Sequence, residues 1–151
     1  MTQEKPLVSI VTVVYNGSAH LQEAIDSVRA QTYPHIEYII IDGGSTDGTL
    51  DLVRRNEDVI RDWISEPDDG IYHAMNKGIA RAKGVYIGLL NADDRFLPDG
   101  VEKAIYALEN LSEPGYTCGG VELIDKAGNV YGSSIPFPEK TRFKRRYIEM
   151  P

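Results

Sequence analysis

The chain has 151 residues, 42% of them hydrophobic and 26% charged, which suits one domain with a single core. Its net charge of −7 argues against general nucleic-acid binding, so no nucleic-acid partner is expected. The only cysteine, Cys118, excludes an internal disulfide and fits a reducing, cytoplasmic compartment. Residues 1–6 contain no apolar segment, so no signal peptide is expected.

Two apolar runs near the start of the chain predict buried strands. Residues 7–15 are rich in β-branched side chains, as in a parallel sheet that is covered by helices on both faces. A helix is expected to follow as far as Ala30, with Ser18 as its N-cap. Its apolar positions repeat at the helical spacing: Leu21, Ala24, Ile25 and Val28. Residues 36–41 form the second run, which stops at Asp42.

The middle of the chain continues the alternation of strands and helices. Thr46 or Asp47 is a candidate cap for a helix that we expect to take in Val59 and Ile60. A short third strand is predicted at residues 63–66, followed by the acidic turn of residues 67–70. An apolar stripe at helical spacing then predicts a helix: Ile71, Ala74, Met75, Gly78, Ile79 and Ala82.

A fourth apolar run, residues 85–90, predicts a core strand that ends at Asn91, Ala92, Asp93 and Asp94. Adjacent carboxylates repel each other and resist burial, so they add nothing to the stability of the fold. A divalent cation shared with a phosphate would offset that cost. The alternative is a plain solvent-exposed turn, and this stretch alone does not decide between them.

The last part of the predicted domain contains a helix, a strand and a hairpin turn. The helix follows Pro98-Asp99-Gly100 and runs through Leu111, and residues 116–124 form a strand in which Cys118 is expected to be a buried small hydrophobe. Residues 125–129 then resemble a hairpin turn.

The alternating pattern predicts a three-layer α/β/α fold with a mainly parallel, Rossmann-like sheet. Ligands of such sheets bind beyond the carboxyl ends of the strands. Polar clusters follow each of the four strands, so they are expected to converge on one edge of the sheet. These clusters begin at Tyr15, Asp42, Glu66 and Asn91.

Several common site types are excluded by their missing motifs. The first strand is not followed by G-x-G-x-x-G, and residues 43–49 lack the G-K-[ST] ending of a P-loop. The three histidines show no zinc-ligand spacing. His20 and His35 are expected to face solvent, whereas His73, on the helix after the acidic turn, is a candidate to face the cleft.

The ordered set of motifs resembles the family-2 glycosyltransferases. The first strand with Asn16, the segment of residues 41–49, Asn76-Lys77-Gly78 and Leu90-Asn91-Ala92-Asp93-Asp94 occur in the order of that family. Residues 65–78 are similar to a subgroup of bacterial polysaccharide-building enzymes. The resemblance implies the glycosyltransferase A-type, nucleotide-diphospho-sugar transferase fold. It also implies inverting transfer of a sugar from a nucleotide-diphosphate donor to a hydroxyl acceptor.

The resemblance also implies a set of site residues. Tyr15 and the backbone near Val14 would flank the nucleotide base, and Asp42 would hydrogen-bond that base, commonly uracil. Asp93 would bind Mg²⁺ or Mn²⁺ between the donor phosphates. Asp94 would act as a water-mediated ligand or would orient the donor ribose and sugar. Further donor-contact candidates are Asn16, Asp69, Asn76, Asn91 and Ala92.

The chain departs from the family pattern in three places. Asn91 stands where the family's D-x-D motif begins with Asp, and Gly43 replaces a common second Asp. For Asp69 a plain turn role is an equal alternative. No acceptor-side segment with a catalytic-base carboxylate is recognised before Pro151. The base is therefore expected beyond Pro151, and the alternative function is a truncated donor-binding domain without turnover. A sugar-nucleotidyltransferase ranks last, since a Gly-rich basic loop does not follow the first strand.

A nucleotide-sugar-binding domain is expected over residues 1–132, and a basic, Pro-containing tail over residues 133–151. The basic cluster at residues 140–147 is open to three interpretations: contact with a membrane surface, a clamp on phosphates, or a solvated end. The expected partners are a nucleotide-sugar donor and a saccharide or lipid-linked acceptor. With a lipid-linked acceptor, the protein is expected at the inner face of the membrane. The oligomeric state is left open.

Overall fold

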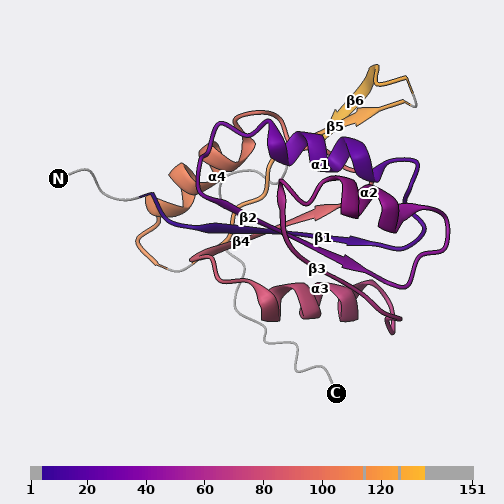
Figure 1. Cartoon of the computed structure of the whole chain (residues 1–151). Coiled ribbons are helices and arrows are strands. Elements are labelled where there is room, and N and C mark those ends of the chain that lie inside the picture. The colour runs from indigo at the N-terminus through magenta and orange to yellow at the C-terminus, as the bar shows by residue number, and fades with distance from the viewer. Residues whose placement is uncertain (1–4, 114, 126, 135–151) are drawn as a thin grey trace.

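A computed structural model of the chain describes residues 5–113, 115–125 and 127–134. Strands and helices alternate along most of it (Figure 1). The elements are β1 (Val8–Val14), α1 (Leu21–Arg29), β2 (Ile36–Asp42), α2 (Thr49–Arg55), β3 (Ile60–Ser65), α3 (Ile71–Arg81), β4 (Tyr86–Asn91), α4 (Gly100–Glu109), β5 (Val121–Ile124) and β6 (Val130–Ser134). β6 runs two residues past the predicted boundary at residue 132, and the basic cluster of the tail lies outside the described residues.

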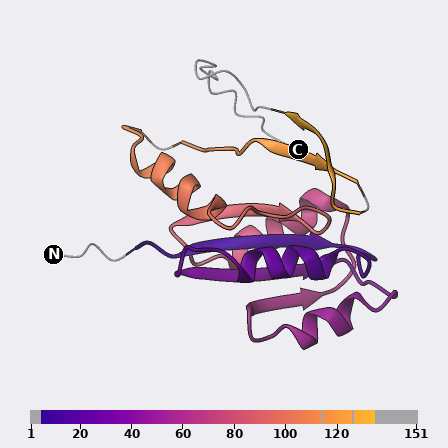
Figure 2. The ribbon, with the colours of Figure 1, turned by 90° about the horizontal axis from the view of Figure 1, so that it is seen from above.

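The central sheet has four parallel strands in the order β3-β2-β1-β4. Val14 at the end of β1 is paired with Asp42 of β2, and Val13 is paired with Asn91 of β4. The view from above in Figure 2 shows the strands side by side, with the separate antiparallel pair β5–β6 beyond β4. The strand ends that carry the polar clusters therefore meet at one edge, as predicted.

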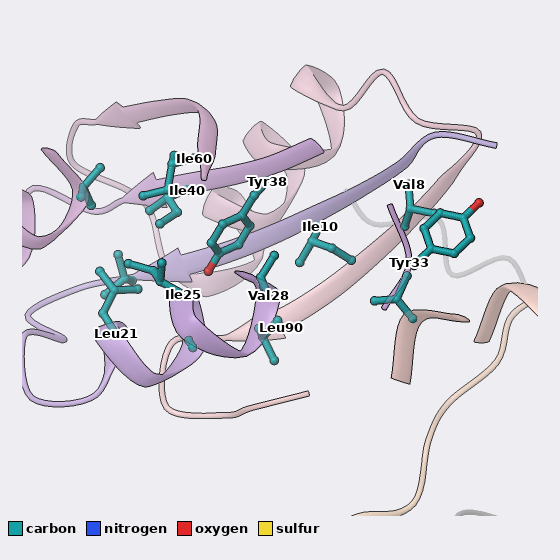
Figure 3. Close-up of a cluster of buried hydrophobic side chains, with 14 of the residues drawn as sticks. Val8, Ile10, Leu21, Ile25, Val28, Tyr33, Tyr38, Ile40, Ile60 and Leu90 are labelled. Carbon is teal, nitrogen blue, oxygen red and sulfur yellow. The ribbon is translucent and has the colours of Figure 1, made fainter. Parts of the chain in front are cut away.

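Helices cover both faces of the sheet, which confirms the three-layer α/β/α architecture. On one face, Leu21, Ile25 and Val28 of α1 pack with Ile10 and Tyr38 of the sheet, and α2 and α4 add further apolar side chains (Figure 3). On the other face, Val11, Val13, Ile39 and Ile41 pack against Ala74 of α3. The strongly apolar strands β1 and β2 are buried because they lie in the middle of the sheet between these two layers.

The boundaries of several elements differ from the prediction, among them those of α1 and β3. α1 begins at Leu21 with His20 at its N-cap position, so the prediction of Ser18 as the N-cap was wrong. The cause is an extra turn, in which the backbone N–H groups of His20 and Leu21 both donate to the carbonyl of Gly17. β3 begins at Ile60, which was wrongly expected in the preceding helix, and it ends at Ser65.

Two predictions of burial, for the fourth strand and for Cys118, were also wrong. Ile87 and Leu89 of β4 are 44% and 48% exposed, because β4 lies at the margin of the four-stranded sheet and α3 packs over β1 and β2. In the apolar stripe of α3, Ile71 and Ile79 are exposed. Cys118 is exposed as well, because the strand that was expected around it begins only at Val121.

Candidate functional site

A cavity of about 480 Å³ opens at the carboxyl ends of β1 and β4. It brings together six of the predicted site residues: Val14, Tyr15, Asn16, Asn91, Ala92 and Asp93. The other lining residues are Val13, Gly17, His20 and Ile71. Tyr15 is 69% exposed although it directly follows a buried strand, so its ring is available for contact with a flat ligand. Residues 50 or more positions apart in the chain thus line one cavity.

Asp42 lies at the end of β2 and is completely buried. Its Oδ2 accepts hydrogen bonds from the backbone N–H groups of Gly44 at 3.0 Å and Ser45 at 2.9 Å, and from the Ser65 hydroxyl at 2.6 Å. Its Oδ1 is buried and has no hydrogen-bond partner in the part of the chain that the structure describes. A buried acceptor without a partner is costly, and a ligand N–H would remove that cost.

The loops after β1 and β2 are joined by hydrogen bonds. The backbone N–H of Asn16 donates to the Ser45 hydroxyl at 2.7 Å, and the Asn16 side-chain oxygen accepts from the Thr46 N–H at 2.9 Å. Asn16 has a left-handed backbone with φ of 50°, which asparagine tolerates better than most residues. The structure therefore gives Asn16 a role in positioning the loop as well as a place in the cavity.

Asp47 forms the second connection between these loops. Its carboxylate accepts hydrogen bonds from the Thr49 hydroxyl at 2.6 Å and from the backbone N–H of Ser18 at 2.9 Å. These hydrogen bonds, that of Thr49 above all, hold the pKa of the Asp47 carboxyl well below its ordinary value. The charged carboxylate thus fixes the turn that precedes α1 at neutral pH.

The turn after β4 places Asp93 at the cavity and Asp94 beside it. The Asn91 side-chain amide donates to Oδ2 of Asp94 at 2.9 Å, and the Asp94 N–H donates to the Asn91 carbonyl at 3.2 Å. Asn91, which replaces the first acid of the family motif, thereby orients Asp94, the acid that directly follows the motif. Asp94 itself does not line the cavity.

These residues fit a divalent cation only as part of a shared site. In residues 5–113, 115–125 and 127–134, no group of three or more His, Cys, Asp or Glu side chains is placed to hold a metal by itself. Mg²⁺ is commonly bound by one or two carboxylates together with substrate phosphates, and Asp93 with neighbouring Asp94 offers that kind of partial site.

The acidic turn before α3 contributes less to the cavity than the sequence suggested. The Lys77 ammonium forms ion pairs with Asp68 and with Glu66, and its pKa is raised chiefly by the hydrogen bond to Asp68. The side chain of Asp69 is 98% exposed, and Asn76 is also exposed. Neither Asp69 nor Asn76 lines the cavity.

Four lining residues were not predicted as site residues: Val13, Gly17, His20 and Ile71. His20 was expected to face solvent and is exposed, and Ile71 belongs to the apolar stripe of α3; both also line the cavity. The only available signal for His20 was its position six residues after the end of β1, because the start of a helix at that edge of the sheet must lie near the ligand.

A larger cavity, of about 650 Å³, lies at the opposite end of β4. It is lined by Val85 and Tyr86 at the start of that strand and by residues at and after the end of α4. Ligands of parallel sheets bind at the carboxyl ends of strands, where the predicted residues also lie, so we assign the smaller cavity as the candidate site.

Comparison with known proteins shows a family match over nearly the whole chain. The model of the family described as "Glycosyl transferase family 2" matches residues 9–151. A putative teichuronic acid biosynthesis glycosyltransferase, TuaG of Bacillus subtilis, is 34% identical over 147 residues, which are 95% of this chain and 58% of that protein. An uncharacterized glycosyltransferase of Mycobacterium tuberculosis is 46% identical over 105 residues, which are 68% of this chain and 40% of that protein.

Solved structures share the fold. The mannosyltransferase PcManGT of Pyrobaculum calidifontis, in complex with GDP-Man and Mn²⁺, has a TM-score of 0.66 and 27% identity over 82% of this chain and 37% of that one. S. aureus TarS residues 1–349, in complex with UDP-GlcNAc, has a TM-score of 0.64 and 17% identity over 78% of this chain and 40% of that one. The chain thus spans less than two thirds of the length of these proteins. Within the described residues, no helix combines the length and apolar character needed to cross a membrane.

Proposed function

The chain belongs to glycosyl transferase family 2, and from that premise we propose that it binds a nucleotide-diphosphate sugar, a UDP-sugar, for transfer of the sugar to a hydroxyl acceptor. The transfer is proposed to be inverting and metal-dependent. The observation that carries the proposal is the cavity in which Tyr15 and Asp93 meet at the edge where Asp42 ends β2.

The base would lie against Tyr15, with Val14 and Asn16 beside it. Asp42 is completely buried and does not line the cavity, so its unpartnered Oδ1 would accept an N–H hydrogen bond of uracil only after a movement of the loop that follows β2. A guanine base also presents N–H donors, and PcManGT binds GDP-Man. UDP and GDP are therefore compared directly in the test below, with UDP expected to bind more tightly.

Asp93 would hold the Mg²⁺ or Mn²⁺ ion together with the donor phosphates, and Asn91, Ala92 and Asp94 would shape the rest of that subsite. The Mn²⁺ in the PcManGT complex supports a divalent metal. Such an ion, when bound, stabilises the negative charge that develops on a diphosphate leaving group. Asp69 and Asn76 remain proposed donor contacts, reached only by parts of the donor that extend beyond the cavity.

The acceptor is proposed to be a saccharide or a lipid-linked saccharide in polysaccharide or glycolipid synthesis. The teichuronic acid role in the name of TuaG supports this class. We also propose that the protein acts in the cytoplasm. With a lipid-linked acceptor it would act at the inner face of the membrane. The transfer needs a carboxylate base to take the proton from the acceptor hydroxyl. That base is proposed to lie outside this chain, so donor binding without turnover is the second candidate function.

Calorimetric titration with UDP in the presence of Mn²⁺ tests the proposal. Asp93→Ala is expected to weaken UDP binding by about tenfold or more, because even loss of an outer-shell partner of a metal typically costs 10–100-fold. Asp51→Ala, which removes an exposed acid on α2, is the control and should bind like the unsubstituted chain.

Two results would contradict the proposal in different ways. Absence of UDP and GDP binding by the unsubstituted chain would overturn the donor site. Equal binding by Asp93→Ala would overturn the metal role alone. Release of free sugar from a radiolabelled UDP-sugar would favour turnover, and donor binding without release would favour the second candidate.

A further inference from the structure

His20 occupies a defined place at the edge of the candidate cavity. Its backbone N–H donates to the Gly17 carbonyl at 3.1 Å, and its carbonyl accepts from the Glu23 N–H at 2.9 Å in the first turn of α1. Its imidazole forms no hydrogen bond or ion pair with another residue that the structure describes. The backbone of His20 is thus fixed while its ring is available to a ligand.

The imidazole ring of His20 differs from the other side chains that line the cavity in the charge that it can carry. Asp93 is the only acidic residue in the lining, and neither lysine nor arginine is part of it. Arg95, which follows the acidic turn, forms an ion pair with Glu23 of α1 at 3.0 Å. His20 is therefore the one lining residue whose side chain can carry a positive charge.

A diphosphate that binds in this cavity needs hydrogen-bond donors as well as a cation. Charge-assisted hydrogen bonds to phosphate are among the stronger polar contacts in proteins. The neutral imidazole also presents one N–H donor, so the contact does not require protonation. The start of the nine-residue helix α1 directly after His20 adds a favourable dipole for an anion on the same side.

We propose that His20 is a donor-binding residue, whose ring N–H donates a hydrogen bond to the diphosphate of the nucleotide sugar opposite Asp93. The inference rests on the proposed function, because it assumes that the diphosphate lies in this cavity. The donor would then be contacted by His20 at the start of α1 as well as by residues at the ends of β1 and β4.

The test compares ligands with and without phosphates. His20→Ala is expected to weaken UDP binding in the presence of Mn²⁺ by about tenfold, the usual cost of losing a hydrogen bond to a charged group, and to change uridine binding less than about twofold. His20→Gln, which keeps an N–H donor, should recover part of the loss. His35→Ala is the matched control, since His35 is exposed and lies at the opposite, amino end of β2.

The outcomes separate the two proposals. If the unsubstituted chain binds UDP and His20→Ala binds it equally well, the role of His20 is overturned and the donor site stands. An equal loss for UDP and uridine would also overturn it, because it would indicate a disturbed base site. The melting temperature of each variant is compared with that of His35→Ala. No UDP binding by the unsubstituted chain would overturn the proposed function and this inference together.

Discussion

Asp42 combines a structural role and a proposed binding role in its two oxygens. Oδ2 holds the loop after β2 through three hydrogen bonds, whereas Oδ1 has no partner among the described residues. In Asp42→Asn, the amide oxygen can keep the place of Oδ2, and an N–H group then replaces Oδ1. We expect UDP affinity to fall by about tenfold, because a donor would face the N–H of the base. Calorimetry measures this change.

Ser65→Ala is the matched control for Asp42→Asn. It removes one hydrogen bond to Oδ2 and leaves Oδ1 unchanged, so it should lower the free energy of unfolding by about 0.5–1.5 kcal/mol and keep UDP affinity. An equal loss of UDP affinity in both variants would show that Asp42 acts only by holding the loop.

At the scale of single residues, the sequence predicted part of the lining of the candidate cavity. Tyr15 and Asp93 could be predicted because each lies within two residues of the end of a strand whose carboxyl end must lie at the ligand edge. His20 could not, because its place at the cavity depends on the extra turn before α1. Asp69 and Asn76 were selected for their place in a motif, and they lie outside the cavity.

The packing of α3 on the sheet depends on a close approach at Gly78. A Cβ atom at this position would lie 2.2 Å from Cγ1 of Val11 and 3.3 Å from Cγ1 of Ile41, so the helix or the strands would have to move. Overpacking of this kind typically costs about 1–3 kcal/mol. We expect Gly78→Ala to lower the free energy of unfolding by that amount in urea denaturation.

Gly100→Ala serves as the control for this prediction. Gly100 is the first residue of α4, and a Cβ there would find its nearest neighbour at 3.7 Å, an ordinary contact. The added methyl group should leave stability unchanged or raise it slightly, since alanine is the better helix former. If Gly78→Ala were equally harmless, the close packing of α3 would be disproved.

Across the whole molecule, the position of a strand in the sheet decides how much its apolar residues contribute. Ile39 of β2 is completely buried, while Ile87 and Leu89 of β4 are about half exposed. Truncation of a buried isoleucine to alanine costs about 2–5 kcal/mol. We expect that loss for Ile39→Ala and less than about 1 kcal/mol for the double variant Ile87→Thr/Leu89→Thr, because about half of each of these side chains is already in water. Urea denaturation compares them, and a loss above 2 kcal/mol in the double variant would contradict the exposure of β4.

By itself, the sequence determined the alternation of strands and helices, the parallel sheet, the convergence of Tyr15, Asp42 and Asp93 on one edge, and the resemblance to the family. These features follow from the local spacing of apolar residues and from the polar residues at the strand ends. Both patterns can be read from a single segment of the chain. The tertiary structure alone decided that β4 lies at the margin of the sheet and that His20 reaches the cavity. Both depend on pairing and loop contacts between residues distant in the chain, which no local pattern encodes.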